Sequence, residues 1–80
     1  MNDTDIQKHI EELVAEEHHL LEKAEAGGME AADHERLERV IVQLDRFYDL
    51  LRQRRAREEF GQDADAVTLR PGAVVEKYLQ

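Results

Sequence analysis

The side chains of the cluster Glu16-Glu17-His18-His19 are of types that can bind a metal ion or transfer a proton. Glu16 and His19 have the E-x-x-H spacing with which helical di-iron proteins present a carboxylate and an imidazole on one face. A di-iron centre also needs inward carboxylates from a second helix, and the apolar stretch at 37–51 has no acidic residue near the centre of its stripe. We therefore expect no resident metal or cofactor, and Glu16 and His19 are the metal-ligand candidates to examine.

A second cluster holds four arginines, Arg52, Arg54, Arg55 and Arg57, in a chain of formal net charge -8. On a helix they point in four directions, whereas a helix that follows a phosphate backbone gathers its basic residues on one face. Arginine at the end of a helix also interacts favourably with the helix dipole. We expect ion pairs with acidic residues near the start of the chain and with a second subunit. The alternative is contact with an anion, a nucleic acid or an unidentified partner protein through Arg52, Arg54, Arg57 and Arg70.

Three polar residues are expected in the core: Glu17, Tyr48 and Arg55. Glu17 lies near the centre of the first apolar stripe, in line with Ile10 and Ala24. A buried carboxylate must be paired, hydrogen-bonded or protonated. The Tyr48 hydroxyl is the nearest partner expected within the chain, and Arg55 could reach Glu17 from a second subunit. We expect these residues to fix the register of the helices or to border a wet gap rather than to bind a ligand.

The composition indicates one small domain and no enzyme. The chain has 80 residues, 38% of them charged, and it contains neither cysteine nor serine. No nucleophile–base constellation and no glycine-rich phosphate loop is present, so we expect no catalytic residues. No apolar run approaches the roughly 18 residues of a membrane span, and the first residues lack the basic and apolar regions of a signal peptide. We expect a cytoplasmic protein without membrane contact.

The hydrophobic periodicity predicts an all-α fold. A first helix is expected at about 5–26, with Thr4 and Gln7 as its capping box and Gly27-Gly28 as its terminator. A second helix is expected at about 31–60, with Asp33 as one candidate cap. The short connection makes the two helices an antiparallel hairpin. A loop at 61–70 and a short helix at 71–79 complete the single domain, residues 1–80.

The apolar stripe of the second helix is roughly 180° wide, which one neighbouring helix cannot cover. The sequence therefore predicts a homodimer in which two hairpins pack as a four-helix bundle with coiled-coil-like contacts. The expected dimer interface contains Val40, Phe47, Leu50 and Leu51. The alternative is a monomer in which the C-terminal helix folds back over the uncovered side.

Several motifs resemble one known family. They are LLRQRRAREEFG at 50–61, the D-x-D formed by Asp63 and Asp65, and the terminal RPGAVVEKYLQ, together with EEH at 16–18 and LDRFYDLL at 44–51. These motifs are similar to the small bacterial family called domain of unknown function 2630, and the resemblance extends over essentially the whole chain. It implies a short, mostly helical protein and carries over no catalytic residues. The resulting hypothesis is a non-enzymatic structural or protein-interaction module, with anion or nucleic-acid binding by the arginines as the alternative.

Overall fold

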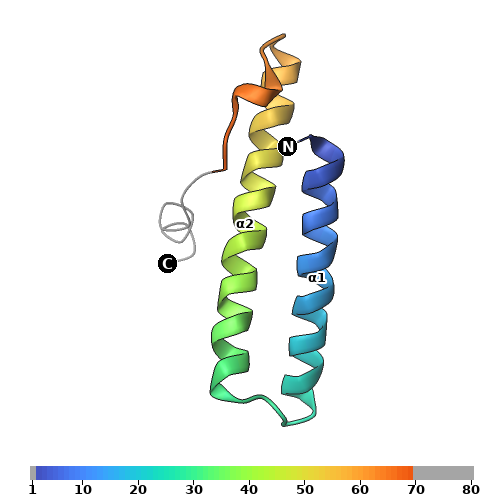
Figure 1. Ribbon diagram of the computed structural model, residues 1–80, viewed down its shortest axis with the longest axis vertical. Coiled ribbons are helices and arrows are strands. Elements are labelled where there is room, and N and C mark those ends of the chain that lie inside the picture. The colour runs from blue at the N-terminus through green and yellow to red at the C-terminus, as the bar shows by residue number, and fades with distance from the viewer. Residues whose placement is uncertain (1, 70–80) are drawn as a thin grey trace.

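Two long antiparallel helices form the body of the protein. The computed structural model describes residues 2–69, so Arg70 and the helix predicted at 71–79 lie outside the described residues. Helix α1 (Asp3–Glu25) lies beside helix α2 (Ala31–Glu59), and a short 3-10 turn, η1 (Ala64–Ala66), follows them (Figure 1). The predicted all-α hairpin is confirmed, while η1 lies within the stretch predicted as an irregular loop. Neither long helix has an apolar segment that could cross a membrane.

Helix α1 begins two residues before its predicted start because a different residue caps it. The backbone N–H of Asp5 donates to Asn2 Oδ1 at 2.8 Å, and the N–H of Asn2 donates back to Asp5 Oδ2 at 3.4 Å. This reciprocal capping box satisfies backbone donors that the first turn would otherwise leave unpaired. The predicted box of Thr4 and Gln7 is therefore wrong.

Both helices end at a glycine in the left-handed conformation. Gly27 has φ 75° and Gly61 has φ 68°, values that glycine adopts without steric cost. At the first end the Gly28 N–H donates to the Lys23 carbonyl at 2.9 Å, and at the second the Gln62 N–H donates to the Arg57 carbonyl at 2.8 Å. These are Schellman motifs. The prediction that Gly27-Gly28 ends the first helix is confirmed.

The connection between the helices is held at the start of α2. Glu30 is the N-cap, and its backbone N–H donates to Asp33 Oδ2 at 3.1 Å. Asp33, the candidate cap from the sequence, lies in the first turn of the helix, where its negative charge suits the helix dipole. It also accepts from Lys23 Nζ at 3.1 Å, which joins the end of α1 to the start of α2.

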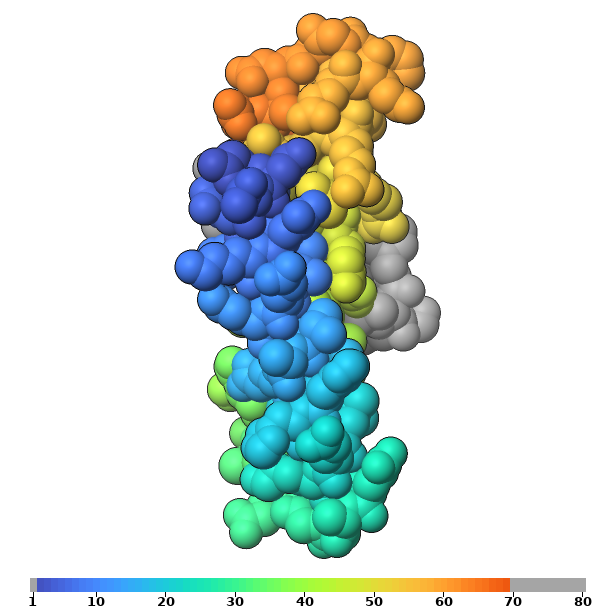
Figure 2. Space-filling view, turned by 90° about the vertical axis from the view of Figure 1, so that its right-hand side faces the viewer, coloured from blue at the N-terminus to red at the C-terminus, as the bar shows by residue number. Residues whose placement is uncertain are grey.

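The core runs along the seam between the helices and is covered within one chain. Its buried members are Ile6, Leu13 and Leu20 from α1 and Val40, Leu44, Phe47, Leu50 and Leu51 from α2. After α2 the chain turns back along this helix (Figure 1), and Val67 and Leu69 of the returning segment pack against the core. The space-filling view shows this segment and the end of α2 above the first turn of α1 (Figure 2).

This packing corrects the expected dimer interface. Val40 is 0%, Phe47 8%, Leu50 4% and Leu51 9% exposed in the single chain. The sequence reasoning covered the wide stripe with a second subunit, or in the alternative with the C-terminal helix at 71–79. In the structure Val67 and Leu69, from the stretch predicted as a loop, supply further cover. The four residues therefore belong to the core of the single chain and are not available for contact with a second one.

Candidate interaction site

The end of the hairpin is fastened by Arg54, whose side chain is 7% exposed. Its Nε donates to Asp3 Oδ1 at 2.7 Å, and its Nη1 donates to Asp65 Oδ1 at 2.9 Å and to the Ala64 carbonyl at 3.2 Å. One guanidinium thus joins the first turn of α1, the last turns of α2 and η1. The hydrogen bonds that Arg54 donates, to Asp3 first and then to Asp65, raise the pKa of its guanidinium and so favour its charged form.

The helical phase explains why Arg54, and not Arg55, is buried. Arg54 continues the row of Phe47 and Leu51, so its aliphatic stem lies over the core. Arg55 points about 100° further round the helix and is exposed. The sequence contained the signal, since Arg54 shares the helical phase of those two apolar residues, but the fold-back of residues 63–69 that completes its burial has no periodic signature.

The other expected core polar residues also lie outside the core of the single chain. Glu17 is half-buried and Tyr48 is 44% exposed. Among the remaining arginines, the Arg52 side chain is 76% exposed with Asp49 Oδ1 at 3.9 Å, and Arg57 is half-buried. Within the arginine run, Arg54 is therefore buried and paired, whereas Arg52 and Arg55 are exposed.

Glu16, the first candidate metal ligand, is held by an arginine. Both carboxylate oxygens accept from Arg36 of α2, Oε1 from Nε and Oε2 from Nη2, the latter at 2.7 Å. The hydrogen bond from Arg36 holds the pKa of Glu16 below its usual value. His19 is exposed. Within residues 2–69, no three or more histidine, aspartate or glutamate side chains lie together so as to hold a metal.

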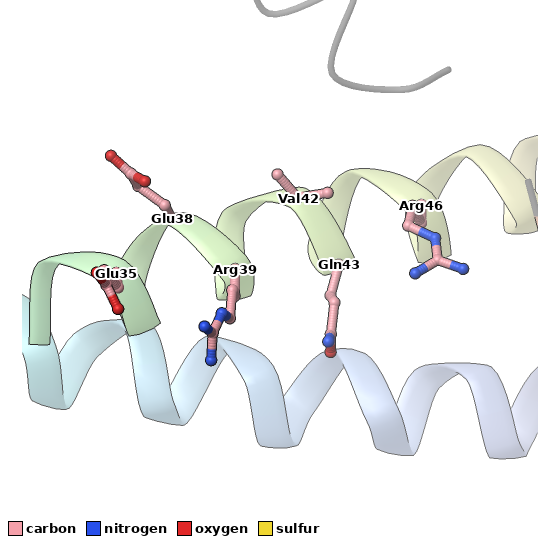
Figure 3. Close-up of a pocket in the computed structure, with 6 residues that line it drawn as sticks. All are labelled: Glu35, Glu38, Arg39, Val42, Gln43 and Arg46. Atoms are coloured by element: carbon pink, nitrogen blue, oxygen red, sulfur yellow. The ribbon is translucent and has the colours of Figure 1, made fainter. Parts of the chain in front are cut away.

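The hollows on α2 are shallow. One, of about 360 Å³, is lined by six residues that all come from α2, and its Glu38 and Val42 point away from α1 (Figure 3). A second, of about 340 Å³, is lined by Asp45, Tyr48, Leu51, Arg52 and Arg55. Here Asp45 Oδ2 is buried without a hydrogen-bond partner.

One flank of the hairpin is closed by side-chain pairs. His9 stacks on Phe47 with ring centroids 5.1 Å apart, Glu16 pairs with Arg36, and Lys23 pairs with Asp33. The α1 residues of these pairs recur every two turns and lie on one side of the buried row formed by Ile6, Leu13 and Leu20.

The opposite flank is apolar, and we call it the apolar face. It consists of two rows with the same spacing, Ile10, Val14 and Leu21 on α1 and Leu37, Ile41 and Tyr48 on α2. Leu21 is 45%, Ile41 36% and Tyr48 44% exposed, and the other three are half-buried. Because the chain directions are opposite, both rows turn toward the same side of the hairpin. The sequence reasoning placed these residues in the core stripes and did not single them out as a surface.

The comparison with known proteins agrees with the resemblance seen in the arginine run and the D-x-D motif. The chain is 40% identical over 77 residues to an uncharacterised protein of Mycobacterium tuberculosis and to one of Mycobacterium bovis, and each alignment covers 95% of this chain and 88% of the relative. No solved structure matches the chain significantly. The family model of DUF2630, described as a protein of unknown function, matches residues 2–80, and the chain therefore belongs to the DUF2630 family.

Proposed function

We propose that the protein is a non-enzymatic interaction module that acts as a homodimer, in which two hairpins associate through the apolar face. The observation that carries the proposal is the partial exposure of Leu21, Ile41 and Tyr48 on one flank. Each Å² of apolar surface left in water costs about 25 cal/mol, and contiguous apolar patches are typical of interaction sites. A second hairpin laid on this flank makes a four-helix bundle.

The polar side chains support a structural role. Arg54, Glu16 and Lys23 each pair with a residue of another element of the same chain. Side chains engaged in this way hold the helices in register and are not poised to transfer a proton or to attack a substrate. The non-enzymatic reading of the sequence remains the proposal.

The test is the mass of the protein in solution, measured by sedimentation velocity over a wide concentration range. We expect a dimer for the wild type and monomers for Ile41→Glu and Tyr48→Glu, because each places a charge in the interface. Phe60→Glu is the matched control, since Phe60 is 78% exposed at the end of α2, away from the apolar face. Circular dichroism should show the same helix content in all four proteins. A monomeric wild type at the highest concentration would refute the proposal.

The alternative function, binding of an anion or nucleic acid, has one supporting observation. Arg52 and Arg55 lie exposed around the hollow that also contains Tyr48. Binding of a labelled RNA to this site would weaken steeply with added salt and would be lost in a double variant of the two arginines to glutamate. The homodimer proposal instead expects no RNA binding at low salt.

A further inference from the structure

The segment that returns along α2 is joined to the helices at few points, and we call residues 63–69 the strap. Within the described part of the chain, Arg54 donates every hydrogen bond between the strap and the helices. Its Nη1 donates to the Ala64 carbonyl at 3.2 Å and to Asp65 Oδ1 at 2.9 Å. The backbone hydrogen bonds of the strap lie within its own 3-10 turn. One side chain therefore latches the strap to the hairpin.

The apolar attachment of the strap is also small. Val67 and Leu69 pack against the core but are only half-buried, and Thr68 between them is exposed. The Asp65 carboxylate that pairs with Arg54 is 75% exposed, and ion pairs open to solvent contribute little to stability. The core between the helices, by contrast, holds eight buried apolar side chains. A segment with so few buried contacts is the kind that opens locally before the rest of a protein unfolds.

The strap covers an apolar strip around Leu50. It runs back along α2 from the level of Arg54 (Figure 1). Leu50 lies one turn before Arg54 on the same side of this helix, so it lies under the path of the strap, and it is 4% exposed. Tyr48 of the apolar face is two residues from Leu50 and therefore points to nearly the opposite side of α2. The covered strip is thus distinct from the apolar face.

We propose that the strap is a cover that opens as a unit while the hairpin stays folded, with the ion pair of Arg54 and Asp65 as its latch. The open form uncovers Leu50 beside the Arg54 guanidinium. Arg54 keeps its bond to Asp3 Oδ1, so the first turn of α1 stays attached to α2. This inference goes beyond the proposed homodimer and does not depend on it. It gives the chain a second apolar surface whose exposure is controlled.

Two other contacts explain why the opening stops at the strap. The Gln62 N–H donates to the Arg57 carbonyl at 2.8 Å, and the Gly61 N–H donates to the Glu58 carbonyl at 3.2 Å. Both bonds precede the strap along the chain, so they hold the end of α2 in either form.

Thiol labelling measures the opening directly, since the chain has no cysteine of its own. Leu50→Cys reports exposure under the strap, and Leu44→Cys, at another buried position, reports separation of the helices. Relative to the unfolded chains, we expect Leu50→Cys to react at least about 30-fold faster than Leu44→Cys. The opening free energy at Leu50→Cys should also fall less steeply with denaturant, because opening the strap exposes less surface than unfolding.

Asp65→Asn tests the latch. It removes the charge that pairs with Arg54, so labelling of Leu50→Cys should accelerate about two- to fivefold, while that of Leu44→Cys should not change. Added salt should accelerate labelling with Asp65 present and have no further effect in Asp65→Asn, because salt screens this pair. The control is Asp63→Asn, an equal charge change that keeps the acceptor for the Asp65 N–H and should leave labelling unchanged.

Hydrogen exchange in the unsubstituted chain gives a second readout that needs no change in the core. The amides of Ala66 and Val67, which are bonded within the turn, should exchange through an opening that depends weakly on denaturant. Exchange of these amides only through global unfolding, or equal labelling of Leu50→Cys and Leu44→Cys, would overturn the cover. Unchanged labelling in Asp65→Asn would overturn the latch. Labelling rates that do not vary with protein concentration would separate the opening from dissociation of a dimer.

Discussion

The substitution Leu50→Ala distinguishes a core position from an interface position. Leu50 is 4% exposed and belongs to the hydrophobic core of one chain. Truncation of a buried leucine costs about 2–5 kcal/mol, and an 80-residue domain has a total stability of about 4–12 kcal/mol. Since 1 kcal/mol shifts the melting temperature of a domain this size by about 4–8 °C, we expect Leu50→Ala to melt at least about 8 °C below wild type.

The assay is thermal unfolding by circular dichroism at two protein concentrations that differ about 100-fold, with the mass measured in parallel. Tyr48→Ala is the companion variant, because Tyr48 is 44% exposed on the apolar face. It should weaken association while leaving the melting temperature of the dilute chain within about 3 °C of wild type. The reasoning would be refuted if Leu50→Ala dissociated the dimer and left the dilute chain as stable as wild type, since Leu50 would then contact a second subunit.

Two further predictions concern the polar contacts. Arg54→Met keeps an apolar stem over the core but leaves Asp3 and Asp65 without their arginine partner. Amide hydrogen exchange at Val67 should therefore accelerate, and the melting temperature should fall by on the order of 5 °C. The control is Arg55→Met, which changes an exposed neighbour and should alter neither the exchange rate nor the melting temperature. Because Arg36 lowers the pKa of Glu16 in the folded chain, the unfolded chain binds more protons in acid, and the stability this pair contributes is present above the unfolded pKa and lost as the pH falls through the folded one. Both side chains are partly exposed, so Glu16→Gln should flatten the decline of melting temperature below about pH 4.5 by only a few °C, and an unchanged slope would show that the pair adds nothing in solution.

The hairpin could be predicted from the sequence because its signals are local. Apolar periodicity specifies the two helices, and a glycine at a helix end specifies the Schellman turn at Gly27. The N-cap was harder, since Asn2 with Asp5 and Thr4 with Gln7 are both plausible capping pairs by spacing. Local pattern alone does not rank two overlapping pairs, and the backbone geometry chose the earlier one.

The expected dimer interface failed for a different reason. A helical wheel reports which face of a helix is apolar but does not report how many segments cover it. Residues 63–69 have no period, yet they carry Val67 and Leu69 to the core and Asp65 to Arg54. The D-x-D motif held a usable signal: Asp63 accepts from the Asp65 N–H at 3.0 Å, which shapes the turn that presents the Asp65 carboxylate to the arginine. A short acidic turn after a helix rich in arginine is therefore worth testing as a fold-back when a wide stripe suggests a dimer.

Side-chain pairs hold the hairpin at both ends and along one flank. Arg54 fastens one end, Lys23 and Asp33 fasten the other, and the pairs of His9 and Glu16 close one flank. These contacts oppose sliding and splaying of the helices, so the apolar face on the remaining flank is presented at a fixed width and register. A prearranged apolar flank lowers the entropic cost of association, and this is the physical advantage that the proposed homodimer would gain from these contacts.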